Sequence, residues 1–163
     1  MRHLRNVLAA GSLSAVVILS GCGDDDDKAA LAADAPSAPT VEFLNADPAT
    51  TSPYSDAVRA GSTLYLAGVL GLDDKGAIVK GGIKAEAKRA LDNLKAVVER
   101  NGSSLDRVTN CEVMLADIKE RDAFNTVYSK YWQQGKFPAR HAFGVTGLYL
   151  GARVEIACIA IAA

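Results

Sequence analysis

The sequence is short of the side chains that build metal centres. Its 163 residues include only three cysteines and two histidines. They form no Cys-x-x-Cys motif and no histidine cluster, so a metal site has no support. An excess of charge of one sign is also missing. The formal net charge is −1, and nothing in this balanced composition indicates nucleic acid as a partner. The length fits one domain.

An apolar run long enough to span a bilayer is missing from the N-terminus. The basic side chains of Arg2, His3 and Arg5 precede an apolar run from Val7 to Leu19. This run is shorter than the ~18 residues that a membrane-spanning helix needs. A basic start followed by a short apolar run is typical of a signal peptide.

The next residues, Leu19-Ser20-Gly21-Cys22, resemble the lipobox of bacterial lipoproteins, whose cysteine is lipidated and becomes the new N-terminus. We therefore expect residues 1–21 to be a lipoprotein signal peptide. The lipid on Cys22 would anchor the protein to a membrane of the bacterial cell envelope, on the periplasmic side of the inner or the outer membrane. Plain secretion and an uncleaved anchor are the alternatives.

Residues 22–40 are predicted to form the lipidated cysteine and a disordered tether. They contain the run Asp24 to Asp27 and then mostly Ala, Pro and Ser, which bury little apolar surface. We interpret the aspartates as a solvated spacer, with a metal-binding or tag-like sequence as the alternative. The folded domain is expected to cover residues 41–163.

Two cysteines remain for the folded domain. Cys111 and Cys158 each lie in a strand-like run. In an oxidising compartment they could pair. The interpretation favoured by the sequence is two buried free thiols that behave as small apolar side chains.

The pattern of the domain alternates strands with two helices. Predicted elements, in chain order, are a strand at 41–44, a hairpin of 54–60 with 63–69, a helix at 83–101, a strand at 108–115, a helix at 117–134 and a strand at 153–161. The first helix has one apolar stripe and a charged outer face that includes Glu86, so it should cover a sheet. Asp122 is the predicted N-cap of the second helix.

The last strand is apolar for almost its whole length, which predicts burial on both faces. One face would lie under the helices. A single chain of this size has nothing left to cover the other, so an oligomer is expected to close over the open face of the sheet.

The segment 138–156 reads as a C-terminal hairpin with a glycine-containing turn at 147–151. Such a hairpin would bring Arg140 and Glu155 close together across the strand pair. The two are then either a structural ion pair or a site. Strand alternation points His141 away from Arg140, so His141 is left out of the site.

Three motifs in order resemble the RidA/YjgF family of enamine/imine deaminases. They are 52–58 (Ser-Pro-Tyr-Ser-Asp-Ala-Val), the helical segment 90–99, and Pro138-Ala139-Arg140 followed by Gly144, Leu148 and Val154-Glu155-Ile156. The resemblance implies an α+β, chorismate-mutase-like fold, with a mixed sheet backed by two helices. It also implies a homotrimer with a central barrel, whose clefts hydrolyse 2-imino and 2-enamino acids to 2-keto acids and ammonia without a cofactor.

The resemblance assigns roles to four residues. Arg140 matches the family's substrate-binding arginine, and a guanidinium holds a carboxylate by two parallel hydrogen bonds. Glu155 matches the acid that positions the attacking water and serves in acid/base catalysis. Tyr54 matches a tyrosine of the cleft, and Gly68 would offer its backbone N–H. No metal or nucleotide is required.

Three positions depart from the family pattern. Ala142 stands where many members carry Ser, Thr or Cys, and Ala67 and Val69 replace a serine and a glutamine. The alternative hypothesis is therefore a non-catalytic module that holds a small carboxylate or a protein partner in the same clefts. A third hypothesis is a structural envelope protein.

Overall fold

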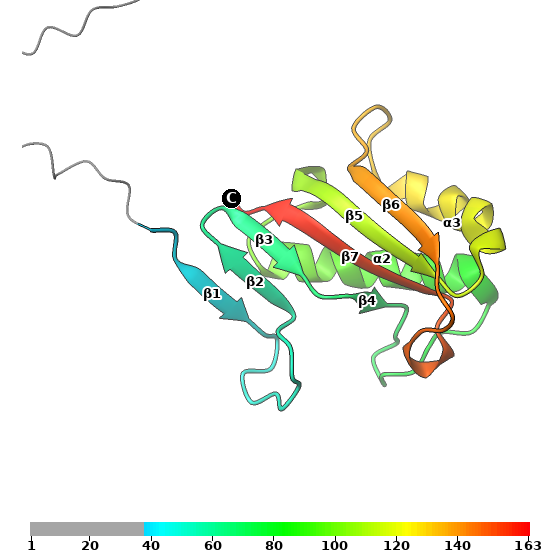
Figure 1. The fold of residues 1–163 in the computed structure, drawn as a ribbon, viewed down its shortest axis with the longest axis horizontal. Helices are drawn as coiled ribbons and strands as arrows, with labels where there is room; N and C mark the ends of the chain where they lie inside the picture. The colour runs from blue at the N-terminus through cyan, green and yellow to red at the C-terminus, as the bar shows by residue number, and fades with distance from the viewer. Residues whose placement is uncertain (1–37) are drawn as a thin grey trace, which may run out of the picture. The chain divides into compact units, whose positions relative to one another are not determined.

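The computed structural model describes residues 38–163 (Figure 1). The strands are β1 (Val41–Leu44), β2 (Ala57–Ala60), β3 (Thr63–Leu66), β4 (Val69–Leu70), β5 (Val108–Leu115), β6 (Ala139–Gly144) and β7 (Val154–Ile161). The helices are α2 (Gly82–Arg100) and α3 (Arg121–Tyr128), with short 3₁₀ turns η1 (Leu105–Arg107), η2 (Ile118–Glu120), η3 (Ser129–Tyr131) and η4 (Tyr149–Gly151).

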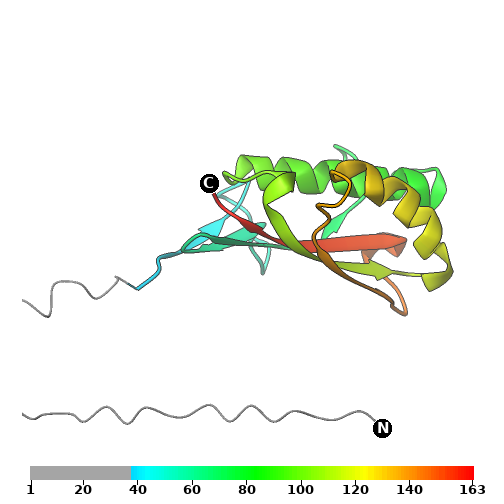
Figure 2. The same cartoon turned by 90° about the horizontal axis from the view of Figure 1, so that it is seen from above.

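One sheet carries the fold, in the strand order β1-β2-β3-β7-β5-β6, with β4 also paired to β7. All neighbours run antiparallel except β5 and β6, which are parallel. Figure 2 shows both helices on the same side of this sheet. The predicted α+β fold, a mixed sheet backed by two helices, is confirmed.

Helix α2 covers the middle of the sheet with its apolar stripe. The stripe residues Ala87, Ala90, Leu91, Leu94 and Val98 are all fully buried. Asn101 ends the helix, and Gly102 follows with φ +75°, a left-handed conformation that glycine adopts without strain. The helix and its predicted end are therefore confirmed.

Glu86 does not lie on the outer face of α2 as predicted. Only 3% of this residue is exposed. Its carboxylate accepts hydrogen bonds from the backbone N–H groups of Arg153 (2.6 Å) and Val154 (3.2 Å) at the start of β7. The spacing of charged residues along the helix cannot show that one of them accepts hydrogen bonds from backbone N–H groups of a distant strand.

The second helix is shorter than predicted. The segment 118–131 is divided into η2, α3 and η3. Asp122 lies inside the first turn of α3, and the capping side chain is Asp117, which accepts from the N–H of Lys119. The N-cap prediction for Asp122 is wrong, because the chain makes a 3₁₀ turn before the α-helix begins.

The predicted C-terminal hairpin is also wrong. Strand β5 lies between β6 and β7 and pairs with both. The chain leaves β6, makes the turn η4 and enters β7 on the far side of β5, so the two strands do not pair. Adjacency in sequence suggested a hairpin, but the long β5 takes the central position.

Strand β7 alternates strictly between buried and half-buried residues. Val154, Ile156, Cys158 and Ala160 are buried under the helices. The intervening residues face the open side and stay partly exposed in a single chain, so burial of both faces remains a prediction.

The two cysteines of the sheet form a disulfide, contrary to the favoured interpretation of free thiols. Cys111 on β5 and Cys158 on β7 are register partners, and their sulfur atoms are bonded. Sequence spacing alone could not show this, because the pairing depends on the register between two strands 47 residues apart.

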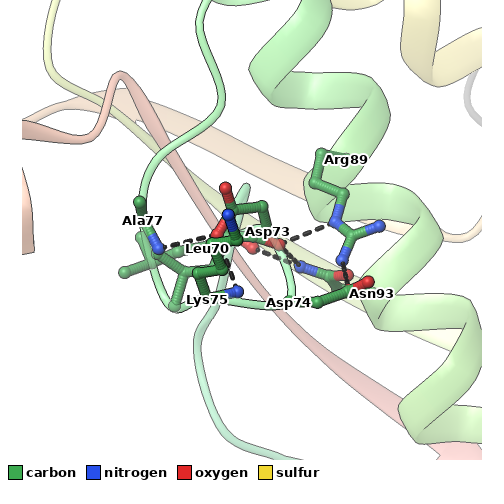
Figure 3. Close-up of polar contacts among 8 residues, drawn as sticks. Leu70, Asp73, Asp74, Lys75, Ala77, Arg89 and Asn93 are labelled. Carbon is green, nitrogen blue, oxygen red and sulfur yellow. Dashed lines mark hydrogen bonds and ion pairs between the residues drawn. The ribbon is translucent and has the colours of Figure 1, made fainter.

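The connection between β4 and α2 is fixed to the helix by side chains of α2 (Figure 3). Arg89 donates to the carbonyl of Leu72, and the Asn93 amide donates to the carbonyls of Leu70 and Leu72. Within the loop, the carboxylate of Asp73 accepts from the N–H groups of Ala77 and Lys75, which lowers its pKa. These contacts hold the end of β4 and the loop after it to α2.

None of the helices within residues 38–163 combines the length and the apolarity needed to cross a bilayer. The predicted signal peptide at 1–21, the lipidation of Cys22 and the tether up to residue 37 lie outside the described residues.

Candidate functional site

Arg140 lies on the edge strand β6, and its side chain lies on the helix side of the sheet. The guanidinium carbon is 4.5 Å from the ring centroid of Tyr128 and 5.8 Å from that of Phe124, both on α3. Cation–π contact holds the cation over these rings. Among the described residues, the Arg140 side chain forms no ion pair and no hydrogen bond, so its donors remain available for an anion.

A pocket of about 370 Å³ opens beside Arg140. Its lining residues are Asn125, Tyr128, Ser129, Phe137, Pro138 and Arg140. Two of these residues carry a polar atom, the hydroxyl of Tyr128 and the amide oxygen of Asn125, that is buried without a hydrogen-bond partner among the described residues. Such unpaired polar atoms are rare in folded proteins and cost free energy until something pairs with them.

Glu155 lies in a second pocket, of about 520 Å³. Its lining residues are Tyr54, Ala67, Gly68, Leu70, Tyr149 and Glu155. Both tyrosines are largely exposed, at 63% for Tyr54 and 71% for Tyr149. Three of the predicted site residues, Glu155, Tyr54 and Gly68, therefore do come together.

Gly68 is in close contact with the Glu155 carboxylate. A Cβ atom at position 68 would overlap Oε1 of Glu155. Only glycine leaves room for the carboxylate in this position. The backbone of residue 68 and the acid are therefore neighbours.

The two pockets do not meet within one chain. Arg140 shares its row of the sheet with Cys111 and Cys158, whereas Glu155 is in register with Met114, three residues further along β5. Two strand spacings and three residues correspond to about 14 Å between the Cα atoms. Arg140 lies under α3, and Glu155 alternates with the buried residues of β7, so the two side chains also lie on opposite faces.

The remaining sequence predictions can be placed on this frame. His141 is exposed and lies opposite Arg140 and Ala142, and Ala142 packs against the core. Ala67 lines the Glu155 pocket, so a methyl group stands where the family has a hydroxyl. Within residues 38–163, no group of three or more His, Cys, Asp or Glu side chains could hold a metal ion.

Three residues that line the pockets were not predicted from the sequence: Tyr128, Asn125 and Tyr149. Tyr128 falls on the apolar stripe of its helix, where an aromatic residue normally signals core packing, and no sequence pattern marked it as a neighbour of Arg140. Tyr149 lies in the turn η4, whose position beside the Glu155 pocket follows from the path of the chain from β6 to β7.

Comparison with known proteins identifies the family. The family model described as "Endoribonuclease L-PSP" matches residues 44–162, which include both pockets. The chain belongs to the RidA/YjgF (L-PSP) family.

Relatives of this RidA-family chain cover nearly all of its folded part. A 2-iminobutanoate/2-iminopropanoate deaminase of Capra hircus is 44% identical over 115 residues, covering 70% of this chain and 83% of the goat protein. The crystal structure of yeast Mmf1 is similar with a TM-score of 0.70 and 30% identity, covering 76% of this chain and 100% of Mmf1. The structure of RidA from the Antarctic bacterium Psychrobacter sp. PAMC 21119 gives 0.66 and 34%, covering 74% and 98%.

Proposed function

We propose that this protein hydrolyses 2-imino and 2-enamino acids to 2-keto acids and ammonia without a cofactor. The observation that carries the proposal is Arg140, a cation with no anionic partner among the described residues, held over aromatic rings at the wall of a pocket. Relatives named 2-iminobutanoate/2-iminopropanoate deaminase support the choice of substrate.

The chemistry matches the groups available. A 2-imino acid carries a carboxylate beside a C=N bond, and the guanidinium of Arg140 binds that carboxylate by two parallel hydrogen bonds. Water adds to the carbon of C=N, a proton moves to nitrogen, and ammonia leaves as the C=O bond forms. The Glu155 carboxylate takes the proton from water and returns it to the leaving nitrogen.

We infer that the complete site forms between copies of the chain. One chain keeps Arg140 and Glu155 on opposite faces of its sheet, so a single substrate can reach both only if two subunits contribute. A homotrimer whose sheets close into a central barrel, the assembly expected from the family resemblance, would supply this arrangement. It would also cover the half-buried residues of β7.

We further propose that the protein is lipid-anchored through Cys22 in the bacterial cell envelope. The disulfide between Cys111 and Cys158 supports this location, because disulfides form and persist in oxidising compartments outside the cytosol. Fractionation of cells tests it. The wild type should sediment with membranes, and the Cys22→Ser variant should not. Equal distribution of the two would exclude the anchor.

The test of the activity is release of 2-oxobutanoate and ammonia from freshly generated 2-iminobutanoate, measured above the spontaneous rate. Arg140→Ala should lower kcat/KM by about 10- to 150-fold, the effect of losing a charge-assisted pair of hydrogen bonds. Arg140→Lys keeps the charge without the planar pair of donors and should fall between the two. An unchanged rate in Arg140→Ala would remove Arg140 from the mechanism.

A non-catalytic binding module is the second candidate, favoured by the methyl groups of Ala67 and Ala142 at positions where the family has polar contacts. A binding module would show saturable binding of 2-oxobutanoate and no turnover of any imine. The family model is named after a ribonuclease, but a net charge of −1 gives no excess of positive charge for a phosphate backbone.

A further inference from the structure

Two tyrosines of the α3 region lie three residues apart and have opposite surroundings. The hydroxyl of Tyr131 is paired, at 2.7 Å from the carboxylate of Asp92 and 3.0 Å from the carbonyl of Lys88. The hydroxyl of Tyr128 is buried and has no partner among the described residues, although only 4% of the residue is exposed. A fully packed tyrosine would normally have its hydroxyl paired.

Tyr128 also occupies the centre of an aromatic row. Its ring centroid lies 5.5 Å from that of Phe124 and 5.3 Å from that of Trp132, and the Arg140 guanidinium lies over its face at 4.5 Å. Tyr128 is the nearer of the two rings under the cation, and packing on both sides keeps it from turning. Its ring therefore limits the planes that the guanidinium can adopt.

The two observations concern the same pocket, which Tyr128, Arg140 and Asn125 line together. We propose that Tyr128 positions the ligand: its ring orients the Arg140 guanidinium, and its hydroxyl donates a hydrogen bond to the carboxylate that Arg140 binds. This inference rests on the proposed function and assigns that site a residue selective for a carboxylate.

The phenol of Tyr128 is in the protonation state that a hydrogen-bond donor needs. Burial raises the pKa of its phenol to about 12, and the positive charge of Arg140 opposes this rise. The phenol is therefore protonated at neutral pH. An uncharged donor beside a guanidinium complements an anion without competing with it for the cation.

The experiment is a titration with 2-oxobutanoate, the keto acid that the proposed reaction releases, so that binding is measured without turnover. Tyr128→Phe keeps the ring over which Arg140 lies and removes only the hydroxyl. It should weaken binding about tenfold, as expected for the loss of a hydrogen bond to a charged group. KM should rise by a similar factor, with kcat little changed.

Tyr131→Phe is the matched control, because it removes a hydroxyl from the same segment. It should lower the melting temperature and leave binding unchanged, since its hydrogen bonds to Asp92 and Lys88 are lost. Tyr128→Phe should leave the melting temperature of the ligand-free protein unchanged or raise it, because an unpaired buried hydroxyl is removed.

The two variants distinguish a failure of the Tyr128 hydrogen bond from a failure of the proposed function. Binding by Tyr128→Phe equal to that of the wild type overturns the proposed hydrogen bond from the Tyr128 hydroxyl to the ligand, whether or not the melting temperature falls. If Arg140→Ala still abolishes binding in that case, the proposed function stands. Wild-type binding by Arg140→Ala would instead overturn the proposed function itself.

Discussion

The Arg140 pocket and the Glu155 pocket lie on opposite faces of the same sheet and offer charged groups of opposite sign. Arg140 lies on the helix side, over buried aromatic rings, and its cation lacks an anionic partner among the described residues. Glu155 lies on the open side, against the backbone of Gly68 and between two exposed tyrosines. The first pocket is a complete place to bind an anion. The second supplies an acid but has no cation to hold the substrate beside it.

A second acid of the chain shows why surroundings decide the role. Glu86 is buried and its carboxylate is occupied by two backbone N–H groups of β7, so it holds the helix to the sheet. Glu155 accepts no hydrogen bond among the described residues and faces a cavity. Each pocket is therefore half of a site. Glu86, although more buried, has a structural role, because its carboxylate is already paired with the backbone.

The largest expected effect concerns the disulfide, which joins the strand next to Arg140 to the strand that carries Glu155. Cys111 is the register partner of Arg140, and Cys158 lies on the strand of Glu155. Replacing both cysteines by alanine should lower the free energy of unfolding by about 4 kcal/mol, from the loop of 47 residues that the bond closes. Chemical denaturation measures this. A reductant should destabilise the wild type by a similar amount and leave the double variant unaffected, and an equal response of both would contradict the bond.

The next effect tests whether the two pockets belong to different subunits of one site. Arg140→Ala and Glu155→Gln should each lose at least tenfold in activity. Unfolding and refolding them together should restore about a quarter of the wild-type activity, since each interface needs one subunit of each kind in the right order. The measurement is keto-acid release from 2-iminobutanoate.

A chain with both substitutions, refolded with either single variant, is the control for that experiment and should restore nothing. If the two single variants also fail to complement each other, Arg140 and Glu155 do not act together across an interface. The contrast between the pockets would then be a contrast between two unrelated sites.

The smallest effect concerns the contact between Gly68 and Glu155. In Gly68→Ala the three atoms nearest to the new methyl group all belong to the flexible Glu155 side chain, so the carboxylate should move while the fold is kept. We expect kcat to fall about tenfold with little change in the melting temperature. Gly147→Ala is the matched control, because a Cβ there meets nothing within 4 Å. Equal kcat in both variants would show that the position of the Glu155 carboxylate does not matter.

Much of the fold could be read from local patterns. Strands β1 and β5 begin and end where alternation and turn residues place them, and α2 follows its apolar stripe to Asn101 and Gly102. These features depend on neighbours within a few residues, so the amino-acid order is sufficient to predict them. The motifs around Tyr54, Arg140 and Glu155 likewise indicated the family without any coordinates.

Long-range contacts are the part that local patterns could not supply. The disulfide of Cys111 and Cys158, the burial of Glu86 and the unpaired hydroxyl of Tyr128 all depend on which distant segments become neighbours. The pattern of apolar residues in one segment predicts the structure of that segment. It does not show which distant strand will pair with it, or in which register.

The amino-acid order by itself determined β1, α2 and β5, the α+β class, and Arg140, Glu155, Tyr54 and Gly68 as groups of the candidate site. Only the tertiary structure decided that β5 separates β6 from β7. It also set the register, in which Arg140 and Glu155 lie three residues apart along β5 and therefore on opposite faces of one sheet. The physical reason is that strand order results from the packing of the whole sheet under its helices, and two strands adjacent in sequence need not pair.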